Sequence, residues 1–240
     1  MSSKAYIRGV GSYLPARVLT NEELAKTVDT SDQWIRERTG ISQRHIAADD
    51  QTTSDLGYRA AIEALKDAKM DASEIDMIIV ATATPDFTFP ATATIIQERL
   101  GIQAGFAFDV QAVCTGFVYA LSVADSMMKT GKAKNALVIG AETFSRILDW
   151  EDRTTCVLFG DGAGAMVLSV DKADHPDAGD GIVSSFIRSD GRYRDLLYVD
   201  GGPSKTQTVG KLRMVGNQVF RHAVRELSDS IKACAADGGM

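Results

Sequence analysis

The sequence predicts an α/β fold in which a largely parallel sheet carries helices on both faces. Two short segments, 76–82 and 136–141, are almost wholly apolar, which is typical of strands buried on both sides. Longer segments with helical periodicity, 53–69 and 117–128, lie between such strands. Strands that alternate with helices in this way build parallel sheets. With 240 residues, 45% of them hydrophobic, the chain is long enough for a substantial core.

The N-terminal part predicts one strand and two capped helices. The strand covers residues 5–10. Two capping boxes then begin at Thr20 and Thr30, where a side-chain oxygen can accept a free N–H group of the first helical turn. The second box opens a helix over 31–39, and Gly40 ends it because glycine adopts the left-handed conformation at little cost.

The alternation continues to residue 170. Each boundary follows from a change between an apolar run and a break rich in Gly or polar residues. The expected elements, in order, are a helix over 53–69, a strand over 76–82, a helix over 91–100, a strand over 106–113, a helix over 117–128 closed at Gly131, a strand over 136–141, and strands over 157–159 and 165–170.

The segment Gly160-x-Gly162-x-Gly164 invites comparison with nucleotide-binding loops. It lacks the Gly-x-Gly-x-x-Gly spacing, no Lys-Ser/Thr pair follows it, and the next element is a strand rather than a helix. We therefore expect a tight turn between two close-packed strands.

The polar segment 171–181, rich in Gly and Asp, is the predicted boundary between a first unit, residues 1–170, and a second unit, residues 182–240. The second unit predicts a strand over 182–187 and a helix over 217–235 with an apolar stripe. This is too little to complete a second sheet. We expect that part of a two-unit protein is missing, as in a truncated chain, or that another chain covers the stripe.

Cys114 is the residue that points most directly to chemistry. It falls at the turn between the predicted strand 106–113 and the apolar helix 117–128. Unpaired N–H groups and the dipole at a helix N-terminus stabilise a thiolate, which attacks carbonyl carbon. The alternative is that Cys114 is a small buried hydrophobic residue, as most free cysteines are.

Charge and composition exclude several classes of protein. A net charge of −6 and a pI of about 5.1 argue against bulk nucleic-acid binding. No apolar run is long enough to cross a membrane and no signal-peptide pattern is present, so we expect a cytoplasmic location. The three cysteines and three histidines lack metal-type spacing and predict neither a disulfide framework nor a metal site.

Several long stretches, taken together and in order, carry a family resemblance. They are Gly11–Pro15, Val28–Gly40, Arg44–Ala47, Phe108–Ala124, Phe159–Ala165 and Met214–Phe220. The chain resembles the N-terminal two-thirds of a β-ketoacyl-acyl carrier protein synthase III of the thiolase-like superfamily. The resemblance implies two related βαβαβαββ halves in five layers, the second half incomplete in this chain, assembled as a homodimer.

The resemblance also implies a reaction. Cys114 would take an acyl group from acyl-CoA, with acetyl-CoA as the expected donor. Malonyl-acyl carrier protein would then lose CO2 and attack the thioester, which initiates type II fatty-acid synthesis. No cofactor is implied, because the CoA thioester is itself the substrate. The family's catalytic His and Asn have no match before Met240, so we expect that this chain alone does not complete the condensation.

Residues that would hold CoA follow from the same resemblance. Trp34 and Arg38 are four apart on one helix and share a face, which suits a purine ring beside phosphates. The alternative is a half-buried Trp anchor with a solvated Arg. The implied CoA-binding residues are Thr30, Trp34, Arg38, Arg153, Met214, Gly216 and Phe220.

Two further surfaces are implied. Phe89 matches the residue that closes the acyl pocket of the partner subunit, although an exposed aromatic residue is also typical of a general dimer contact. Arg221 and Arg225 would dock the acidic carrier protein, and a solvated helix face is the alternative for both.

Two other functions stay open at this point. One is another thiolase-like Claisen enzyme, such as a 3-hydroxy-3-methylglutaryl-CoA synthase or a starter synthase of secondary metabolism. The other is a non-catalytic partner that binds acyl groups or pairs with an active subunit. The retained Cys114 argues against a pure scaffold.

Overall fold

The computed structural model describes residues 4–170 and 181–239. The chain divides into two compact units, each built from non-contiguous stretches. The first unit comprises Met1–Pro15, Ala48–Thr143 and Gly162–Ile187, and the second comprises Ala16–Ala47, Phe144–Asp161 and Arg188–Met240. These units are not the related halves predicted over 1–170 and 182–240, and that division stays a prediction.

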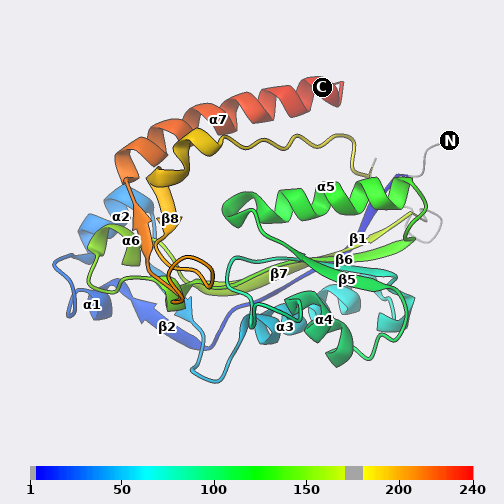
Figure 1. The fold of residues 1–240 in the computed structure, drawn as a ribbon, viewed down its shortest axis with the longest axis horizontal. Helices are drawn as coiled ribbons and strands as arrows, with labels where there is room; N and C mark the ends of the chain where they lie inside the picture. Colours follow the sequence, from blue (N-terminus) through cyan, green and yellow to red (C-terminus); the bar gives the residue numbers. More distant parts are fainter. Residues whose placement is uncertain (1–3, 171–180, 240) are drawn as a thin grey trace. The chain divides into compact units, whose positions relative to one another are not determined.

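The first unit contains a five-stranded sheet in the order β1-β7-β6-β4-β5 (Figure 1). Strand β4 pairs in parallel with β5 on one side and with β6 on the other, while β1 pairs antiparallel with β7. The strands are β1 (Tyr6–Tyr13), β4 (Met77–Ala81), β5 (Phe106–Val110), β6 (Asn135–Thr143) and β7 (Asp161–Ser169). The predicted mixed α/β architecture is therefore confirmed.

Helices cover both faces of this sheet. Helices α3 (Thr53–Ala68) and α4 (Thr92–Arg99) pack on one face, and α5 (Gly116–Lys129) packs on the other (Figure 1). Strand β1 lies tightly against α3, because a Cβ atom at Gly11 would come within 2.3 Å of a backbone nitrogen of that helix. The central strand β4 is buried along its whole length, as its apolar sequence predicted.

The second unit is made of short elements around two small apolar clusters. Strands β2 and β3 form an antiparallel pair, as do β8 and β9. Its elements are β2 (Arg17–Thr20), α1 (Asn21–Leu24), α2 (Asp32–Thr39), β3 (Gln43–Ile46), α6 (Arg153–Cys156), β8 (Leu197–Val199), β9 (Leu212–Met214) and α7 (Gly216–Asp237), with 3-10 turns at Phe144–Ile147 and Gly191–Leu196.

The helix caps agree with the sequence in part, since neither predicted capping box is complete: Thr20 caps α1, but the Glu23 carboxylate pairs with Arg17. Thr20 accepts the Glu23 N–H at the start of α1, and Gly40 ends α2 with φ at 72°. The cap of α2, however, is Ser31 rather than the predicted Thr30. Ser31 has the extended backbone of an N-cap residue, and its Oγ accepts the N–H of Trp34 at 3.1 Å.

Two predicted strands are wrong. Residues 182–187 form no strand, since the Ile182 N–H donates to the Ala5 carbonyl without starting a ladder. Residues 157–159 also form none, because they follow α6 in a turn and the Val157 carbonyl accepts from the Arg44 guanidinium. An apolar run forms a strand only where a neighbouring strand supplies hydrogen-bond partners, and the sequence pattern alone does not show such a neighbour. The boundary segment 171–180 lies outside the described residues.

The glycine-rich segment is also not the predicted turn. Gly162 and Gly164 lie inside β7, and Gly164 pairs with Ser12 of β1. Gly160, just before β7, abuts β3, where an added Cβ would lie 2.9 Å from the Cβ of Arg44. Close packing, rather than ligand binding, accounts for glycine at position 160.

The apolar stripe of α7 is exposed in the structure, as the sequence suggested. Phe220 and Ile231 are each 69% exposed, and Val224 and Leu227 between them are more than half exposed. Within the described residues, α7 therefore buries little of its apolar side chains, and its hydrophobic stripe is available for contact.

Helix α4 depends on a carboxylate from a neighbouring strand. Its N-cap residue Ala91 has no side-chain acceptor, and Asp109 of β5 instead accepts the N–H groups of Thr92 and Ala93 at 2.7 and 2.8 Å. Two free donors of the first helical turn are thus satisfied by one charged acceptor.

We predict that Asp109→Ala lowers the free energy of unfolding by about 2 kcal/mol, because it removes a charged helix cap. Chemical denaturation would measure the change. Glu98→Ala, an exposed position on the same helix, is the control and should change stability by less than about 0.5 kcal/mol. Equal losses in the two variants would contradict the capping role.

Candidate active site

Cys114 lies where β5 passes into α5. The strand ends at Val110, a 3-10 turn covers Val113–Thr115, and α5 begins at Gly116. The Cys114 side chain is exposed, so the structure does not support its interpretation as a buried hydrophobic residue. Sequence analysis thus located this turn correctly, although β5 ends three residues before the predicted boundary.

The backbone next to Cys114 is strained. Val113 has φ at 47°, in the left-handed region that β-branched residues rarely adopt. Such outliers persist only where the surrounding structure imposes them, and they are common at active sites. The strain at Val113 therefore marks the Cys114 turn as a candidate functional site on geometric grounds.

Two glycines allow this turn to sit close to the sheet. A Cβ at Gly116 would lie 3.2 Å from the Cβ of Ala81 at the end of β4. A Cβ at Gly140 of β6 would lie 3.3 Å from the ring of Phe117. The first turn of α5 therefore lies over the carboxyl ends of the parallel strands, where α/β proteins commonly place their ligands.

A second cluster, in the other compact unit, surrounds Trp34. The guanidinium carbon of Arg38 lies 4.5 Å from the centre of the Trp34 ring, and that of Arg153 lies 5.2 Å from it. Arg153 also donates to the carbonyl of Asp29. A half-buried indole between two guanidinium groups offers both a stacking surface and positive charge, as a nucleotide with phosphates requires.

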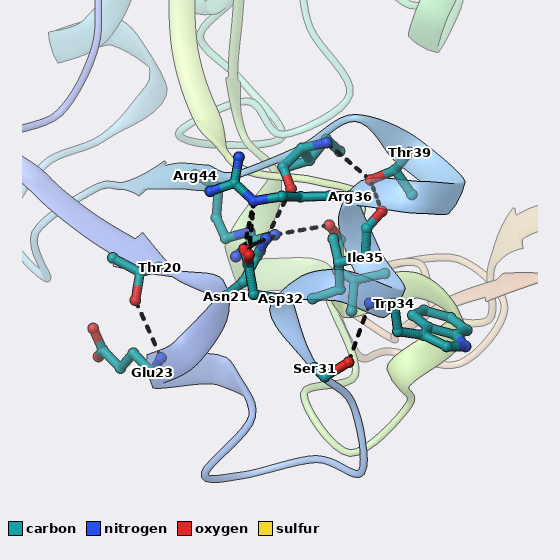
Figure 2. A network of polar contacts seen from close by, with 12 residues as sticks. Thr20, Asn21, Glu23, Ser31, Asp32, Trp34, Ile35, Arg36, Thr39 and Arg44 are labelled. Carbon is teal, nitrogen blue, oxygen red and sulfur yellow. Dashed lines mark hydrogen bonds and ion pairs between the residues drawn. The ribbon is translucent and has the colours of Figure 1, made fainter.

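A buried polar network fixes helix α2, which carries Trp34 (Figure 2). The amide of Asn21, fully buried, donates to Asp32 Oδ1 and to the Ile41 carbonyl, both at 2.8 Å, and accepts from Arg44 at 2.9 Å. Asn21 thereby uses both its amide donors and its amide oxygen within one interior site.

Arg44 is the buried centre of that network. Arg44 is 5% exposed, and its guanidinium donates to the carbonyls of Leu19 and Val157 as well as to Asn21. Burial lowers the pKa of Arg44, since no carboxylate touches it directly. Sequence reasoning did not identify Asn21 or Arg44. Arg44 opens the matched stretch Arg44–Ala47, whereas Asn21 lies in none of the matched stretches.

The remaining CoA candidates lie elsewhere in the second unit. Met214 ends β9, Gly216 begins α7, and Phe220 is an exposed residue of α7. Thr30 is partly buried, and its hydroxyl has no hydrogen-bond partner in the structure. The structure thus brings together Trp34, Arg38 and Arg153, whereas the CoA roles of all seven residues stay predictions.

The two arginines predicted to dock a carrier protein differ in their surroundings. Arg225 pairs with Glu226 at 3.0 Å, so part of its charge is neutralised. Arg221 is exposed on the same helix and makes one long hydrogen bond to the Asn217 carbonyl at 3.4 Å. Arg221 is therefore the more available cation for an acidic partner.

The two histidines that the structure describes, His45 and His222, lie in the second unit, whereas Cys114 lies in the first. His45 lies in β3, and His222 lies in α7 with its ring 4.1 Å from that of Tyr193. His175 lies outside the described residues. Over residues 4–170 and 181–239, no cluster of His, Cys, Asp and Glu could hold a metal ion.

A hollow of about 370 Å³ lies on the sheet of the first unit, on the side of Phe117. Its lining is almost wholly apolar and comprises Gly11, Phe117, Gly140, Gly164 and Ala165. No polar side chain lines it to orient a ligand, so the candidate chemistry stays with Cys114.

Sequence comparisons agree with this arrangement. The family described as 3-Oxoacyl-[acyl-carrier-protein (ACP)] synthase III matches residues 108–191, which include Cys114. The beta-ketoacyl-[acyl-carrier-protein] synthase III of Rhodospirillum centenum is 62% identical over 240 residues, 100% of this chain and 74% of that protein. The protein of the same name from Caulobacter vibrioides is 60% identical over 237 residues, 99% of this chain and 74% of that protein.

Solved structures show the same fold. The 3-oxoacyl-[acyl-carrier-protein] synthase III from Aquifex aeolicus VF5 superposes with a TM-score of 0.90 at 44% identity, covering 98% of this chain and 72% of that one. The priming beta-ketosynthase of the R1128 polyketide pathway gives a TM-score of 0.86 at 33% identity, covering 95% of this chain and 68% of that one.

The α/β fold, with a cysteine at a strand-to-helix turn, defines a thiolase-like condensing enzyme. The similarity to the relatives is extensive enough to decide the family. The chain belongs to the β-ketoacyl-[acyl-carrier-protein] synthase III family, and it is an acyltransferase of that kind. Among the residues that the structure describes, no helix combines the length and apolar character needed to cross a membrane.

Asn21 also controls the ionisation of Asp32. The hydrogen bond from Asn21 is the largest cause that lowers the pKa of Asp32 below its ordinary 3.8, and the ion pair with Arg36 at 2.7 Å is the next. A lowered pKa means that the folded state favours the carboxylate. Its contribution to stability is present above pH 3.8 and is lost as the pH falls through the lowered value.

We predict that Asn21→Ala raises the pKa of Asp32 toward 3.8, as measured by NMR titration of the side-chain carboxyl. The control is Thr20→Ala, which removes the neighbouring cap of α1 without touching Asp32. An Asp32 pKa that is unchanged in Asn21→Ala, or equally raised in Thr20→Ala, would show that the network does not act through this bond.

Proposed function

We propose that this protein carries out the initiating condensation of type II fatty-acid synthesis, with Cys114 as the acyl acceptor. The observation that carries the proposal is the exposed Cys114 at the start of α5, beside the strained Val113, in a chain of this family. A soft thiolate is the nucleophile that suits a thioester.

The first half-reaction is acyl transfer. The Cys114 thiolate attacks the carbonyl carbon of acyl-CoA, with acetyl-CoA as the expected donor, and a tetrahedral oxyanion forms. N–H groups at the start of α5 are suited to stabilise this charge. The oxyanion collapses, CoA leaves as a thiolate that takes up a proton, and Cys114 keeps the acyl group as a thioester.

The second half-reaction is condensation. Malonyl-acyl carrier protein loses CO2, its carbanion attacks the Cys114 thioester, and the product 3-oxoacyl-acyl carrier protein leaves as the Cys114 thiolate is restored. The thioester supplies the activated acyl group, so no metal or prosthetic group is needed. The CoA end of the first substrate is assigned to the Trp34, Arg38 and Arg153 cluster, together with Thr30, Met214, Gly216 and Phe220.

The protein is proposed to act as a homodimer in the cytoplasm. Strand β5 is the last strand of its sheet, with Phe106 and Phe108 stacked 6.4 Å apart on one face. An uncovered sheet edge with aromatic side chains favours association with a second copy. Phe89, 83% exposed on the loop before α4, is then available to close the acyl pocket of the partner subunit.

The alternative functions are not favoured. A non-catalytic partner would have no use for a reactive thiol at a strained turn, and relatives of about 60% identity carry the synthase III name. Dependence of the second substrate on acyl carrier protein is the property that separates a CoA-dependent Claisen enzyme, such as a 3-hydroxy-3-methylglutaryl-CoA synthase, from the proposed enzyme.

The deciding experiment is intact-mass spectrometry of this chain after incubation with acetyl-CoA. We predict one acetyl adduct that is lost in Cys114→Ala and retained in Cys234→Ala, which removes the other cysteine that is not fully buried. Circular dichroism would establish that each sample is folded. A folded chain without an adduct, or an adduct lost only in Cys234→Ala, would contradict Cys114 as the acceptor.

Carrier-protein docking makes a separate prediction. Arg221→Glu should weaken binding of malonyl-acyl carrier protein by about fivefold at low salt, because it replaces attraction by repulsion, and should leave acetyl transfer to Cys114 unchanged. Fluorescence titration of the carrier protein would measure this. Lys232→Glu, exposed farther along α7, is the matched control. If Arg221→Glu lowered carrier-protein binding and acetyl transfer to Cys114 by the same factor, the docking role would be refuted.

A further inference from the structure

The loop between β4 and α4 presents two exposed aromatic side chains. Phe87 is 61% exposed and Phe89 is 83% exposed. Large side chains left this free in solution would normally sample many positions. The remainder of the loop, however, is held by hydrogen bonds to three other elements of the first unit, so the loop presents these rings from a fixed base.

Glu142, near the end of β6, holds the first part of the loop. Its Oε1 accepts the N–H of Ala83 at 2.8 Å, and its Oε2 accepts the hydroxyls of Thr84 and, at 3.4 Å, Thr82. One carboxylate therefore binds three successive residues that follow β4.

Because of Thr84, the hydrogen bonds between the loop and position 142 require a carboxylate at that position. Its hydroxyl accepts the N–H of Thr143 at 2.9 Å, so its single proton is directed to Glu142. The Thr84 carbonyl in turn accepts the hydroxyl of Thr53 at the start of α3. An amide in place of the carboxylate would direct its NH2 group at this hydroxyl and leave the Thr84 proton without its acceptor.

The rest of the loop is fixed in the same way. Asp86 accepts the N–H and the hydroxyl of Ser54 at 2.9 and 2.6 Å, which ties the loop to the first turn of α3. Asp109 holds the N-terminus of α4, where the loop ends. Phe87 and Phe89 thus lie between fixed points.

Glu142 also lies on the face of the sheet that is covered by α5, the helix that follows Cys114. Alternate residues of β6, Ala136 and Val138, pack in the cluster under α5, so Glu142 shares their face. Burial raises the pKa of its carboxyl against the opposing hydrogen bonds. A carboxyl whose pKa is raised by burial is a candidate functional group when it also lies near a candidate active site.

We infer that Glu142, through Thr84, is a positioning residue that sets acyl-chain selectivity by fixing the loop that carries Phe89. The inference rests on the proposed function, in which Phe89 closes the acyl pocket of the partner subunit. A fixed ring limits the length of the acyl group, and a loosened loop admits longer ones.

The test compares Cys114 acylation by acetyl-CoA and by hexanoyl-CoA, followed by intact-mass spectrometry of the full chain. Glu142→Gln should raise the hexanoyl-to-acetyl rate ratio by about three- to tenfold, a change in the range of a small alteration to an apolar pocket. Thr84→Val, which keeps the carboxylate but removes the hydroxyl, should shift the ratio in the same direction. Phe89→Ala is the reference for a fully opened pocket.

Asp76→Asn is the matched control. Asp76 Oδ2 accepts the N–H groups of Lys134 and Asn135 at 2.8 and 3.0 Å, and so ties β4 to β6 at the opposite end of the same strands. A thermal melt of each variant would record the loss of stability. The control should lose stability without any change in the acyl-CoA ratio.

Several results would overturn the inference. The first is a hexanoyl-to-acetyl rate ratio that stays unchanged in both Glu142→Gln and Thr84→Val, or that stays unchanged in Phe89→Ala. The second is a ratio that shifts as much in Asp76→Asn as in Glu142→Gln. The third is an equal slowing of acylation by both acyl-CoA donors in Glu142→Gln. The last result would assign Glu142 to the chemistry instead of to selectivity. Failure of the unaltered chain to acylate Cys114 would be a failure of the proposed function, which the same spectra report separately.

Discussion

Backbone N–H groups at the ends of helices and strands need acceptors, and in this protein carboxylates from neighbouring elements supply many of them. Asp109 of β5 satisfies the start of α4, Asp86 satisfies the start of α3, and Asp76 joins β4 to β6. Each bond links two elements that are distant in sequence. A charged acceptor is about twice as strong as a neutral one, so these contacts fix positions as well as satisfy donors.

The same constraint connects the fold of the first unit to its chemistry. Strand β5 holds α4 through Asp109, and five residues later it delivers Cys114 to the start of α5. Close packing at Gly116 and Gly140 holds the first turn of α5 against the sheet, and Val113, in the turn before it, has a positive φ. The exposed thiol thus lies in a turn between a strand of the sheet and a helix packed on that sheet, which is the rigid support a nucleophile requires.

In the second unit, backbone carbonyls and a side-chain amide join carboxylates as partners of the buried polar groups. Arg44 is surrounded by carbonyls and the Asn21 amide, and the nearest carboxylate in the network, Asp32, is reached through that amide. Asp161 accepts the N–H groups of Ala47 and Ser145. Because desolvating a guanidinium is costly, removing any partner leaves a charge or a donor unsatisfied. Because the apolar clusters of this unit are small, polar contacts fix much of its conformation.

The sequence predicted those features that depend on local pattern. Apolar periodicity located β4, β6, α3 and α5 within a few residues, and the Thr20 cap, the Gly40 stop and the Cys114 turn follow from local chemistry. It failed where a distant partner decides the structure. Residues 182–187 lack a neighbouring strand, and position 164 pairs with β1 instead of turning.

The same distinction, between local sequence pattern and distant partners, applies to the functional residues. The helical spacing predicted that Trp34 and Arg38 share a face, but the family resemblance assigned them to CoA, as it did Arg153. Glu142 and Asn21 were missed, since nothing in their local sequence indicates that each binds groups from several elements. A carboxylate that accepts from three residues across a sheet is visible only once β4 and β6 are known to be neighbours.

The chemistry separates into steps with different demands on the protein. Acyl transfer needs a reactive thiol, donors for an oxyanion and a hold on CoA, and groups suited to each demand occur among the described residues. Condensation also needs groups that stabilise a carbanion formed by loss of CO2, and neither His45 nor His222 lies in the unit of Cys114. Because transfer ends in a covalent thioester, it can be observed without the second step. The acylation state of Cys114 is therefore the property through which the nucleophile, the CoA cluster and the Phe89 loop can each be examined.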